Sequence, residues 1–557
     1  MTALDDLADR YVDDFAALDP CRAALMGIAG QESALTDYSP EGFAARTDLS
    51  RRTLADLDAL SAGDGAGNGA GHGAGGAGRV AAAVLRERLH VELALDEAGV
   101  SDHLMDTIDG PVQRLRQAFE LLDEGPATPW EAMRARLRAL PGSLEGLRTT
   151  LTRARQEGRV VARRQVLRNV RASAQTEAYV AGLAAAYGEG PLRPELDAAC
   201  GEAARALAGF GAFLAGELAP YAPERDALGR DRYELGVRDF LGTRLDLAET
   251  YAWGWEELAR IGTEIDNAAE RVLPGEPLPT VLAALDADPR YRVRGAERFR
   301  AWLQELADGA IAELHGTHFD IPEPLHRVDC RIPAEEGVYY LAPAEDLSRP
   351  GTVWWGVADP DREIVTWGVP ATMVHEGVPG HHLQLGVTTL NTGTLNRFQR
   401  LSSELFPGHC EGWGLYAERL MGELGYFRDP AHRLGMWAGG QRFRAARIVL
   451  DIGLHLELEI PRGAGFHEGE RWTPELALEF LRAHTTPDTA VEFEIDRYLG
   501  RPAQAIAYKV GEKVWLEARE AARRREGAAF DLKEFHRRAL DLGPMGLDLL
   551  RTELAAA

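Results

Sequence analysis

Cysteine is scarce in this sequence: 557 residues contain four, namely Cys21, Cys200, Cys330 and Cys410. No two of them form a Cys-x-x-Cys pair, which excludes a zinc site built from thiolates and argues against a disulfide framework. We expect four reduced and mostly buried thiols.

Long apolar runs are also missing. No stretch reaches the roughly 18 consecutive apolar residues of a membrane-spanning helix. The first residues, MTALDDLADRYVDDF, are acidic and amphipathic, whereas a secretory signal starts with basic residues followed by an apolar run. We therefore expect a cytoplasmic protein with no membrane partner.

Positive charge is in deficit as well, with 62 Lys and Arg against 87 Asp and Glu and a formal net charge of −25. Such a chain repels phosphate backbones and anionic lipid surfaces. Nucleic acid is therefore not an expected partner, and the acidity is more typical of general solubility than of a cationic substrate.

Helix-forming residues are abundant, and the chain is long enough for a large core or for two lobes. The stretch TPWEAMRARLRAL, residues 128–140, is typical of the helical segments: it predicts Thr128 as N-cap, Glu131 in a capping box, and Met133 and Leu137 on one face. We expect a mainly α fold.

Two segments depart from this pattern. Residues 61–79, SAGDGAGNGAGHGAGGAGR, have glycine at nearly every second position and predict a flexible loop. Residues 326–369 contain short runs rich in Val, Tyr, Trp and Ile between Pro, Gly and Asp, which predicts two to four short strands. A strand there could bind an extended substrate through main-chain hydrogen bonds.

The stretch VHEGVPGHHLQ, residues 374–384, is close to a helical His-Glu-x-x-His zinc signature, but Pro379 stands where the second histidine should be. On a regular helix His375 and His381 would lie on different faces, and His382 would lie about 10.5 Å further along the axis than His375. Because Pro interrupts a helix and Gly tolerates almost any backbone angles, we expect Pro379 and Gly380 to loop out and return His381 to the ligand position.

This interpretation makes His375 and His381 metal ligands and Glu376 the general base that takes a proton from water. A catalytic zinc needs a third protein ligand. The best candidate is Glu411, thirty residues after His381 in the predicted helix PGHCEGWGLYAERLMGEL. Glu418 lies on the same face and is the alternative, and Glu404 and His409 are also near.

The motifs HEGVPGHHLQ and EGWGLYAERL resemble the DUF885 family of bacterial proteins, and so do DYSPEGFAAR, RIVLDIGLH and EIDRYLGRPAQAIAYKVGEKV. The resemblance covers nearly the whole chain, which we therefore take as a single catalytic domain, residues 1–557. It implies a relationship to M32 carboxypeptidases and other gluzincin metallopeptidases, with two helical lobes around a deep groove. It also implies one zinc ion held by His375, His381 and Glu411.

Other side chains could act on a substrate. Tyr508 is our first candidate for stabilising an oxyanion, and Arg497 for binding a substrate carboxylate; Lys509, next to Tyr508, is expected to be solvated. In the strand region, Tyr339, Tyr340 and Arg349 are candidates for lining the cleft. Asp451 and His455 share a helical face and form either a pair that orients a ligand or a structural ion pair.

The sequence leaves three functions open. The first is a zinc-dependent hydrolase of amide bonds, a carboxypeptidase-like enzyme acting on short peptides or peptide-like small molecules. The second is a metal-dependent hydrolase or lyase that cleaves a C–N bond in a specialised metabolite, and the third is a non-catalytic helical binding protein. The oligomeric state is not predicted.

Overall fold

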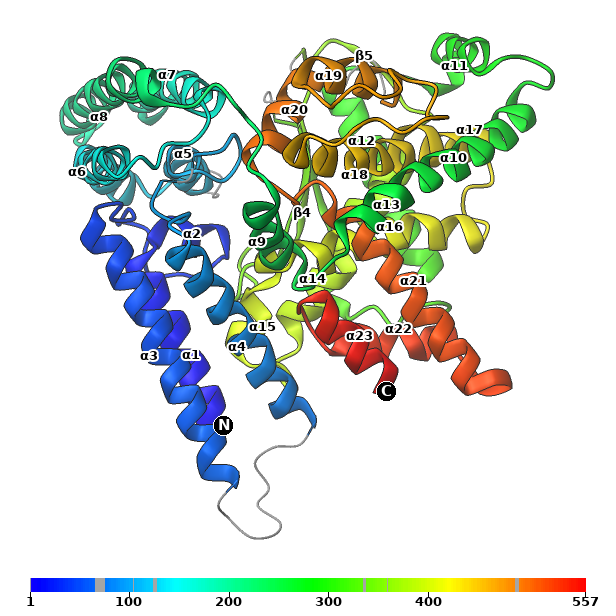
Figure 1. Cartoon of the computed structure of the whole chain (residues 1–557), viewed down its shortest axis with the longest axis horizontal. Coiled ribbons are helices and arrows are strands. Elements are labelled where there is room, and N and C mark those ends of the chain that lie inside the picture. The colour runs from blue at the N-terminus through cyan, green and yellow to red at the C-terminus, as the bar shows by residue number, and fades with distance from the viewer. Residues whose placement is uncertain are drawn as a thin grey trace. The chain divides into compact units, whose positions relative to one another are not determined.

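The computed structural model describes residues 2–65, 76–103, 105–123, 128–333, 337–357, 359–485 and 490–556. Within these ranges the chain is mainly helical, as the composition predicts, and the helices fall into two compact units (Figure 1). The first unit comprises residues 1–228, 396–398 and 492–501, and the second comprises the rest.

The first unit is built on a helical core. Along α6 the buried Met133, Leu137, Leu140, Leu144 and Leu147 recur every three or four residues, and α8 packs against both α6 and α7. The helices of this unit are α1 (Ala3–Leu18), α2 (Pro20–Leu25), α3 (Pro40–Gly65), α4 (Gly76–Glu97), α5 (Pro111–Asp123), α6 (Trp130–Gln156), α7 (Arg163–Tyr187), α8 (Arg193–Phe213) and α20 (Val491–Gly500).

Two sequence predictions need correction in this unit. The capping box at Thr128 is wrong: α6 begins at Trp130, its N-cap is Pro129, and no side chain caps it. The amide of Trp130 instead donates to the carbonyl of Thr128 in a turn. The loop expected at 61–79 is shorter at both ends, because α3 continues to Gly65 and α4 begins at Gly76; residues 66–75 lie outside the described residues.

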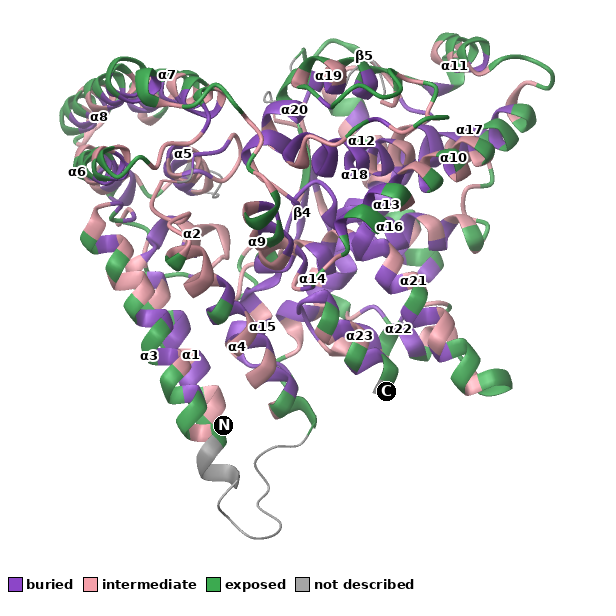
Figure 2. Cartoon of the chain, in the orientation of Figure 1, coloured by how far each residue is buried: buried purple, intermediate pink, exposed green. Residues whose placement is uncertain are grey.

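The second unit contains the candidate site. Its helices are α9 (Arg230–Leu241), α10 (Leu247–Val272), α11 (Leu278–Ala287), α12 (Ala296–Leu314), α13 (Val369–Glu376), α14 (His381–Leu390), α15 (Arg397–Leu401, whose first two residues belong to the first unit), α16 (Pro407–Glu423), α17 (Pro430–Gly435), α18 (Arg442–Leu456), α19 (Pro474–Ala483), α21 (Ala507–Glu526), α22 (Leu532–Asp541) and α23 (Leu547–Ala556). Buried residues predominate in α14, α16 and α18 (Figure 2).

Short strands occupy the region expected to contain them. β2 (Asp329–Arg331), β4 (Thr352–Trp355) and β3 (Val338–Leu341) form a sheet in that order, parallel between β2 and β4 and antiparallel between β4 and β3. β5 (Glu363–Val365) lies in the same region but pairs with β1 (Arg292–Arg294), a strand that the sequence did not indicate.

A glycine contact brings α16 and α21 close together. A Cβ atom on Gly412 of α16 would lie 2.4 Å from the backbone of Gly511 on α21, and one on Gly511 would lie 2.1 Å from the carbonyl oxygen of Gly408. Only glycine permits this approach. It places Glu411 and Tyr508, which neighbour these glycines in sequence, on two helices in direct contact.

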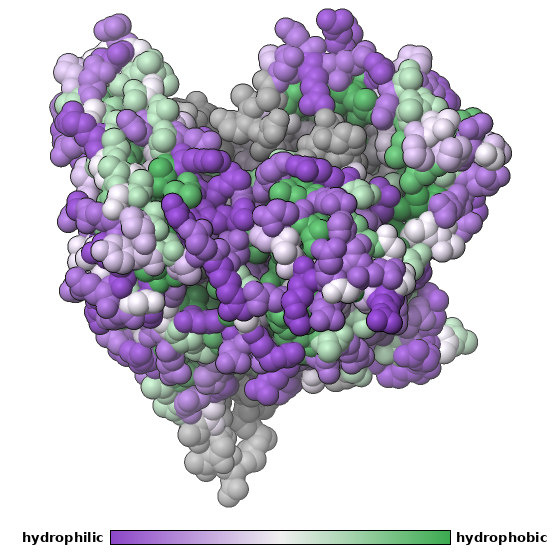
Figure 3. Space-filling view, turned by 45° about the horizontal axis from the view of Figure 1, so that its top comes forward, coloured by the Kyte–Doolittle hydropathy of each residue, from purple (hydrophilic) through white to green (hydrophobic). Residues whose placement is uncertain are grey.

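All four cysteines lie among the described residues and are buried free thiols, as expected. No described helix combines the length and the apolar composition that a bilayer-spanning segment needs. The face of the molecule in Figure 3 is mostly hydrophilic, with hydrophobic residues in smaller patches.

Candidate metal centre

The expanded histidine motif breaks the helix instead of bulging it. α13 ends at Glu376 and α14 begins at His381, and the amide of Gly380 donates to the carbonyl of Val374, six residues back, where a regular helix would reach four. A Cβ on Gly380 would lie 2.0 Å from the carbonyl oxygen of His375. The two extra residues thus loop out as predicted, although through two separate helices.

The break brings together the three predicted ligands. Nε2 of His375 lies 3.2 Å and Nε2 of His381 lies 3.4 Å from Oε2 of Glu411, and one ligand atom from each residue falls within 4.8 Å of the others. Atoms bound to a tetrahedral zinc at about 2.1 Å are about 3.4 Å apart. Among the described residues this is the one group of three or more His, Cys, Asp and Glu found close enough to share a metal ion. The residues fit the predicted ion.

A second acid of α16 holds the first ligand in place. Nδ1 of His375 lies 2.9 Å from Oε1 of Glu418, and the other oxygen of Glu418 accepts a hydrogen bond of 3.1 Å from the Gln441 amide. With Nδ1 donating to Glu418, Nε2 keeps its lone pair for a metal. Glu418, the alternative ligand in the sequence, therefore orients His375 and lies on the far side of its ring from Glu411.

Two glycines and a π-helical turn make room for the contact between His375 and Glu418. A Cβ on Gly414 would lie 2.5 Å from the His375 ring, and a Cβ on Gly440 would lie 2.9 Å from Oε2 of Glu418. Gln441 ends a π-helical turn, Met436–Gln441, a rare element that is frequent at functional sites. The heptad spacing from Glu411 to Glu418 is visible in the sequence, whereas nothing in the sequence marked Gln441.

The pKa values of His375 and Glu411 are shifted because the ionisable groups of the cluster lie close together. Burial lowers the pKa of His375, but hydrogen bonds with Glu411 and Glu418 outweigh it and raise this pKa to about 10. Burial opposes ionisation of Glu411, yet the hydrogen bonds from His375 and His381 hold its pKa well below the usual range. A proton on His375 thus provides the positive charge that stabilises the half-buried carboxylate of Glu411.

Glu376 is buried, with 7% of its surface exposed. Burial raises its pKa above the usual value for a glutamic acid, and the positive charges of His375, His381 and Arg444 oppose that increase. A raised pKa makes the carboxylate beside the predicted ligands a stronger proton acceptor than an ordinary glutamate.

The neighbouring His382 is occupied elsewhere. Its Nε2 lies 3.0 Å from the carbonyl oxygen of Leu325, and its Nδ1 lies 3.0 Å from the hydroxyl of Tyr340. Burial lowers the pKa of His382 to about 4, so the ring is neutral, donates to Leu325 and accepts from Tyr340. The Tyr340 ring stacks on His381 at 6.5 Å, which places this tyrosine of β3 beside the metal ligands.

Tyr508 also lies at the cluster. Its ring stacks on the ring of His375 with 6.4 Å between centroids, and two arginines of α18, Arg444 and Arg447, lie over it at 5.7 and 4.8 Å. Arg497, the other predicted substrate-binding residue, is in α20 of the first unit, where it forms an ion pair of 3.4 Å with Glu494.

Lys509 is not solvated, which corrects the sequence-based expectation. Its side chain is fully buried, and its Nζ pairs with Glu257 at 2.9 Å, with Gln441 at 2.9 Å and with Glu512. Because Gln441 also contacts Glu418, a continuous hydrogen-bonded chain runs from the predicted ligand His375 to Lys509. Asp451 accepts hydrogen bonds from the Tyr233 hydroxyl at 2.6 Å and the Ala503 amide at 2.8 Å, which supports a structural role.

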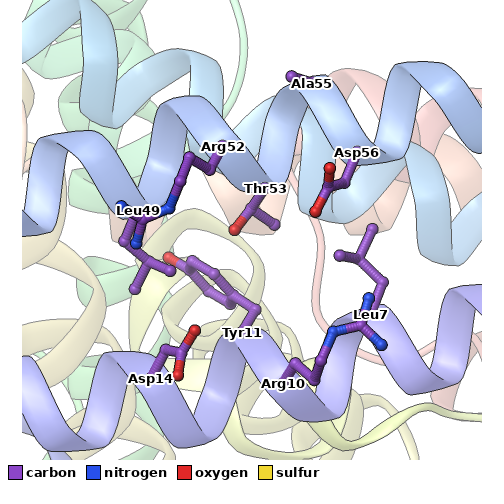
Figure 4. A pocket seen from close by; sticks show the side chains of 9 residues that line it. All are labelled: Leu7, Arg10, Tyr11, Asp14, Leu49, Arg52, Thr53, Ala55 and Asp56. Atoms are coloured by element: carbon purple, nitrogen blue, oxygen red, sulfur yellow. The ribbon is translucent and has the colours of Figure 1, made fainter.

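A separate small cavity lies between α1 and α3 (Figure 4). Its charged lining residues are Arg10, Asp14, Arg52 and Asp56, so that positive and negative charges balance. It contains no histidine or cysteine, and we assign it no function.

Comparison with known proteins identifies relatives of this fold and the family of the chain. The chain has the fold of a "putative lipoprotein" from Colwellia psychrerythraea, with a TM-score of 0.80, 20% identity, and 100% of this chain and 99% of the other covered. It also resembles a "putative lipoprotein of unknown function" from Shewanella oneidensis, with a TM-score of 0.70, 16% identity and 99% of both chains covered. No protein of curated function matches. The family model described as "bacterial protein of unknown function (DUF885)" matches residues 20–554, and the chain therefore belongs to the DUF885 family.

Proposed function

We propose that this protein is a zinc-dependent hydrolase of amide bonds, acting as a carboxypeptidase-like enzyme on short peptides. One observation carries the proposal: His375, His381 and Glu411 converge with ligand spacing while Glu376 follows the first ligand directly. Two imidazoles and a carboxylate are the ligand set of hydrolytic zinc sites. The relationship to M32 carboxypeptidases and other gluzincins, which the sequence resemblance implies, is part of this proposal.

A zinc ion bound there would polarise the amide carbonyl and acidify a water molecule. Glu376 accepts the proton of the attacking water and passes it to the departing amine, a role that suits its raised pKa. Tyr508, stacked beside His375, donates a hydrogen bond to the developing oxyanion. Glu418 holds the His375 ring so that Nε2 faces the ion.

The test compares the unaltered protein with Glu376→Gln. We expect metal analysis to find one zinc per chain in both, and a peptide library read by mass spectrometry to show turnover lowered by about 10²-fold or more in the variant. Cleavage at an equal rate would refute the assigned mechanism. A zinc-loaded, folded protein that leaves every library peptide intact would refute the peptidase assignment and favour a specialised amide or a binding role.

A further inference from the structure

An arginine beside the candidate metal centre, Arg444, forms no ion pair with any described residue. Arg444 lies over the Tyr508 ring, yet no described carboxylate lies within ion-pair distance of its guanidinium, and its Nε has no hydrogen-bond partner among the described residues. Most arginines that flank acids in this protein are paired; Arg260 with Glu257 and Arg519 with Glu423 are examples.

Its neighbour Arg447 has a different role. Arg447 is 3% exposed and lies between the rings of Phe443, at 4.1 Å, and Tyr508. Arg444 is less buried and lies over the same Tyr508 ring, so it is the one of the two that a ligand can reach. Arg447 instead packs on the ring of Tyr508, the same ring that Arg444 contacts, and holds it in position.

The position of Arg444 relates it to the reacting groups. Its guanidinium is 5.7 Å from the Tyr508 ring, and that ring is 6.4 Å from the ring of the ligand His375. The sum of these two distances is no longer than a peptide of about three or four extended residues. A charge held by Arg444 therefore lies within a few residues of a bond positioned at the metal ligands.

We propose that Arg444 binds a carboxylate of the substrate, so that the site takes peptides or peptide-like amides with a free carboxylate close to the cleaved bond. The guanidinium fork matches a carboxylate with two parallel hydrogen bonds, and partial burial strengthens such a pair. The statement about the cleaved bond rests on the proposed hydrolase function. Binding of a carboxylate by Arg444 does not, and it can be tested without turnover.

The binding test uses zinc-loaded protein and two probes that differ in charge, N-benzoylglycine and its amide, N-benzoylglycinamide, in calorimetric titrations. We expect the acid to bind about tenfold or more tightly than the amide, and Arg444→Gln to remove this difference while leaving amide binding unchanged. Arg444→Lys should restore part of it, because lysine keeps the charge and loses the fork.

Two matched variants serve as controls. Arg442→Gln removes another arginine of α18, one that forms no ion pair with a described residue. Its charge acts on His484 at the end of α19, and the variant should keep the acid preference. Arg497→Gln tests the arginine that the sequence favoured. The inference is overturned if the acid does not bind, if Arg444→Gln binds it within about twofold of the unaltered protein, or if Arg497→Gln alone loses it.

A turnover test separates this inference from the proposed function. Tripeptide pools with free and with amidated C-termini are incubated with the unaltered protein and with Arg444→Gln. If neither pool is cut while the binding difference persists, the hydrolase proposal fails and the carboxylate site stands. If both pools are cut equally by both proteins, the carboxylate site is refuted and the hydrolase proposal stands.

Discussion

The second unit buries charge in two connected places, and the two places are neutralised differently. Around Lys509, the acids Glu257 and Glu512 are paired with the ammonium group of a fully buried lysine. Around Glu411, no lysine or arginine among the described residues forms an ion pair with the acid, which faces two imidazole nitrogens. A buried carboxylate needs a compensating charge.

This difference shows which cluster is structural. The Lys509 cluster carries its own cation, is closed, and needs nothing from solution. The histidine cluster offers three converging lone-pair donors, so it obtains positive charge only from protons or from a metal ion. The chain through Gln441 and Glu418 joins the two, so that the closed cluster supports the open one.

The largest effect should come from opening the closed cluster. Lys509→Met removes the buried cation, leaves Glu257 and Glu512 facing each other without it, and should cost about 3–5 kcal/mol of unfolding free energy. Lys513→Met on the same helix removes a cation over the Trp253 ring and should cost about 1 kcal/mol or less. Urea denaturation of the zinc-loaded proteins measures both, and equal costs would contradict a structural role for Lys509.

Next in size is the loss of a ligand from the open cluster. His381→Ala should lower zinc affinity by more than the roughly 10²-fold that loss of an outer partner causes. His382→Ala should retain the ion, because both nitrogens of His382 are bonded to Leu325 and Tyr340. Competition with a zinc chelator measures the two affinities. An empty His382 variant beside a zinc-loaded His381 variant would reverse the ligand assignment.

A smaller loss is expected at the junction between the clusters. Glu418→Gln keeps an acceptor for Nδ1 of His375 but removes the charge that favours that orientation, and zinc affinity should fall about 10- to 100-fold. Gln441→Leu removes the hydrogen bond from Gln441 to Glu418, which lies one residue further from the predicted ligand His375. It serves as the comparison, with a smaller expected loss of zinc affinity. If Glu418→Gln abolished zinc binding as completely as Glu411→Gln, Glu418 would be a ligand in its own right.

Much of this organisation follows from the sequence, for identifiable reasons. The Pro379-Gly380 pair can only interrupt a helix, so the return of His381 to the cluster is predictable from rotation and rise alone. Glu411 and Glu418 share a helical face, but spacing cannot tell which of two acids on one face meets the metal. That choice depends on which side of the His375 ring each acid reaches.

Other features depend on contacts between distant segments. Lys509 has ordinary sequence neighbours, and its burial results from the approach of α21 to the elements that carry Glu257 and Gln441. The same holds for Arg444, which becomes notable only because α18 and α21 bring it to Tyr508. Local pattern cannot predict such pairs, since it carries no information about which helices pack together.

Counted per pH unit, the smallest effect is a pH dependence of zinc binding at the open cluster. In the metal-free protein the pKa of His375 is raised to about 10, so the ring is protonated at neutral pH. The proton then occupies the lone pair of Nε2 that zinc requires. Zinc must displace that proton, and its affinity should therefore rise about tenfold for each pH unit between roughly 7 and 9 and level off above pH 10. Chelator competition across this range, in buffers that bind zinc weakly, measures the slope. The rise of zinc affinity with pH should be less steep in Glu418→Gln, because this variant lacks one of the hydrogen bonds that raise the pKa of His375. If the zinc affinity of the unaltered protein did not depend on pH, His375 would carry no proton to displace.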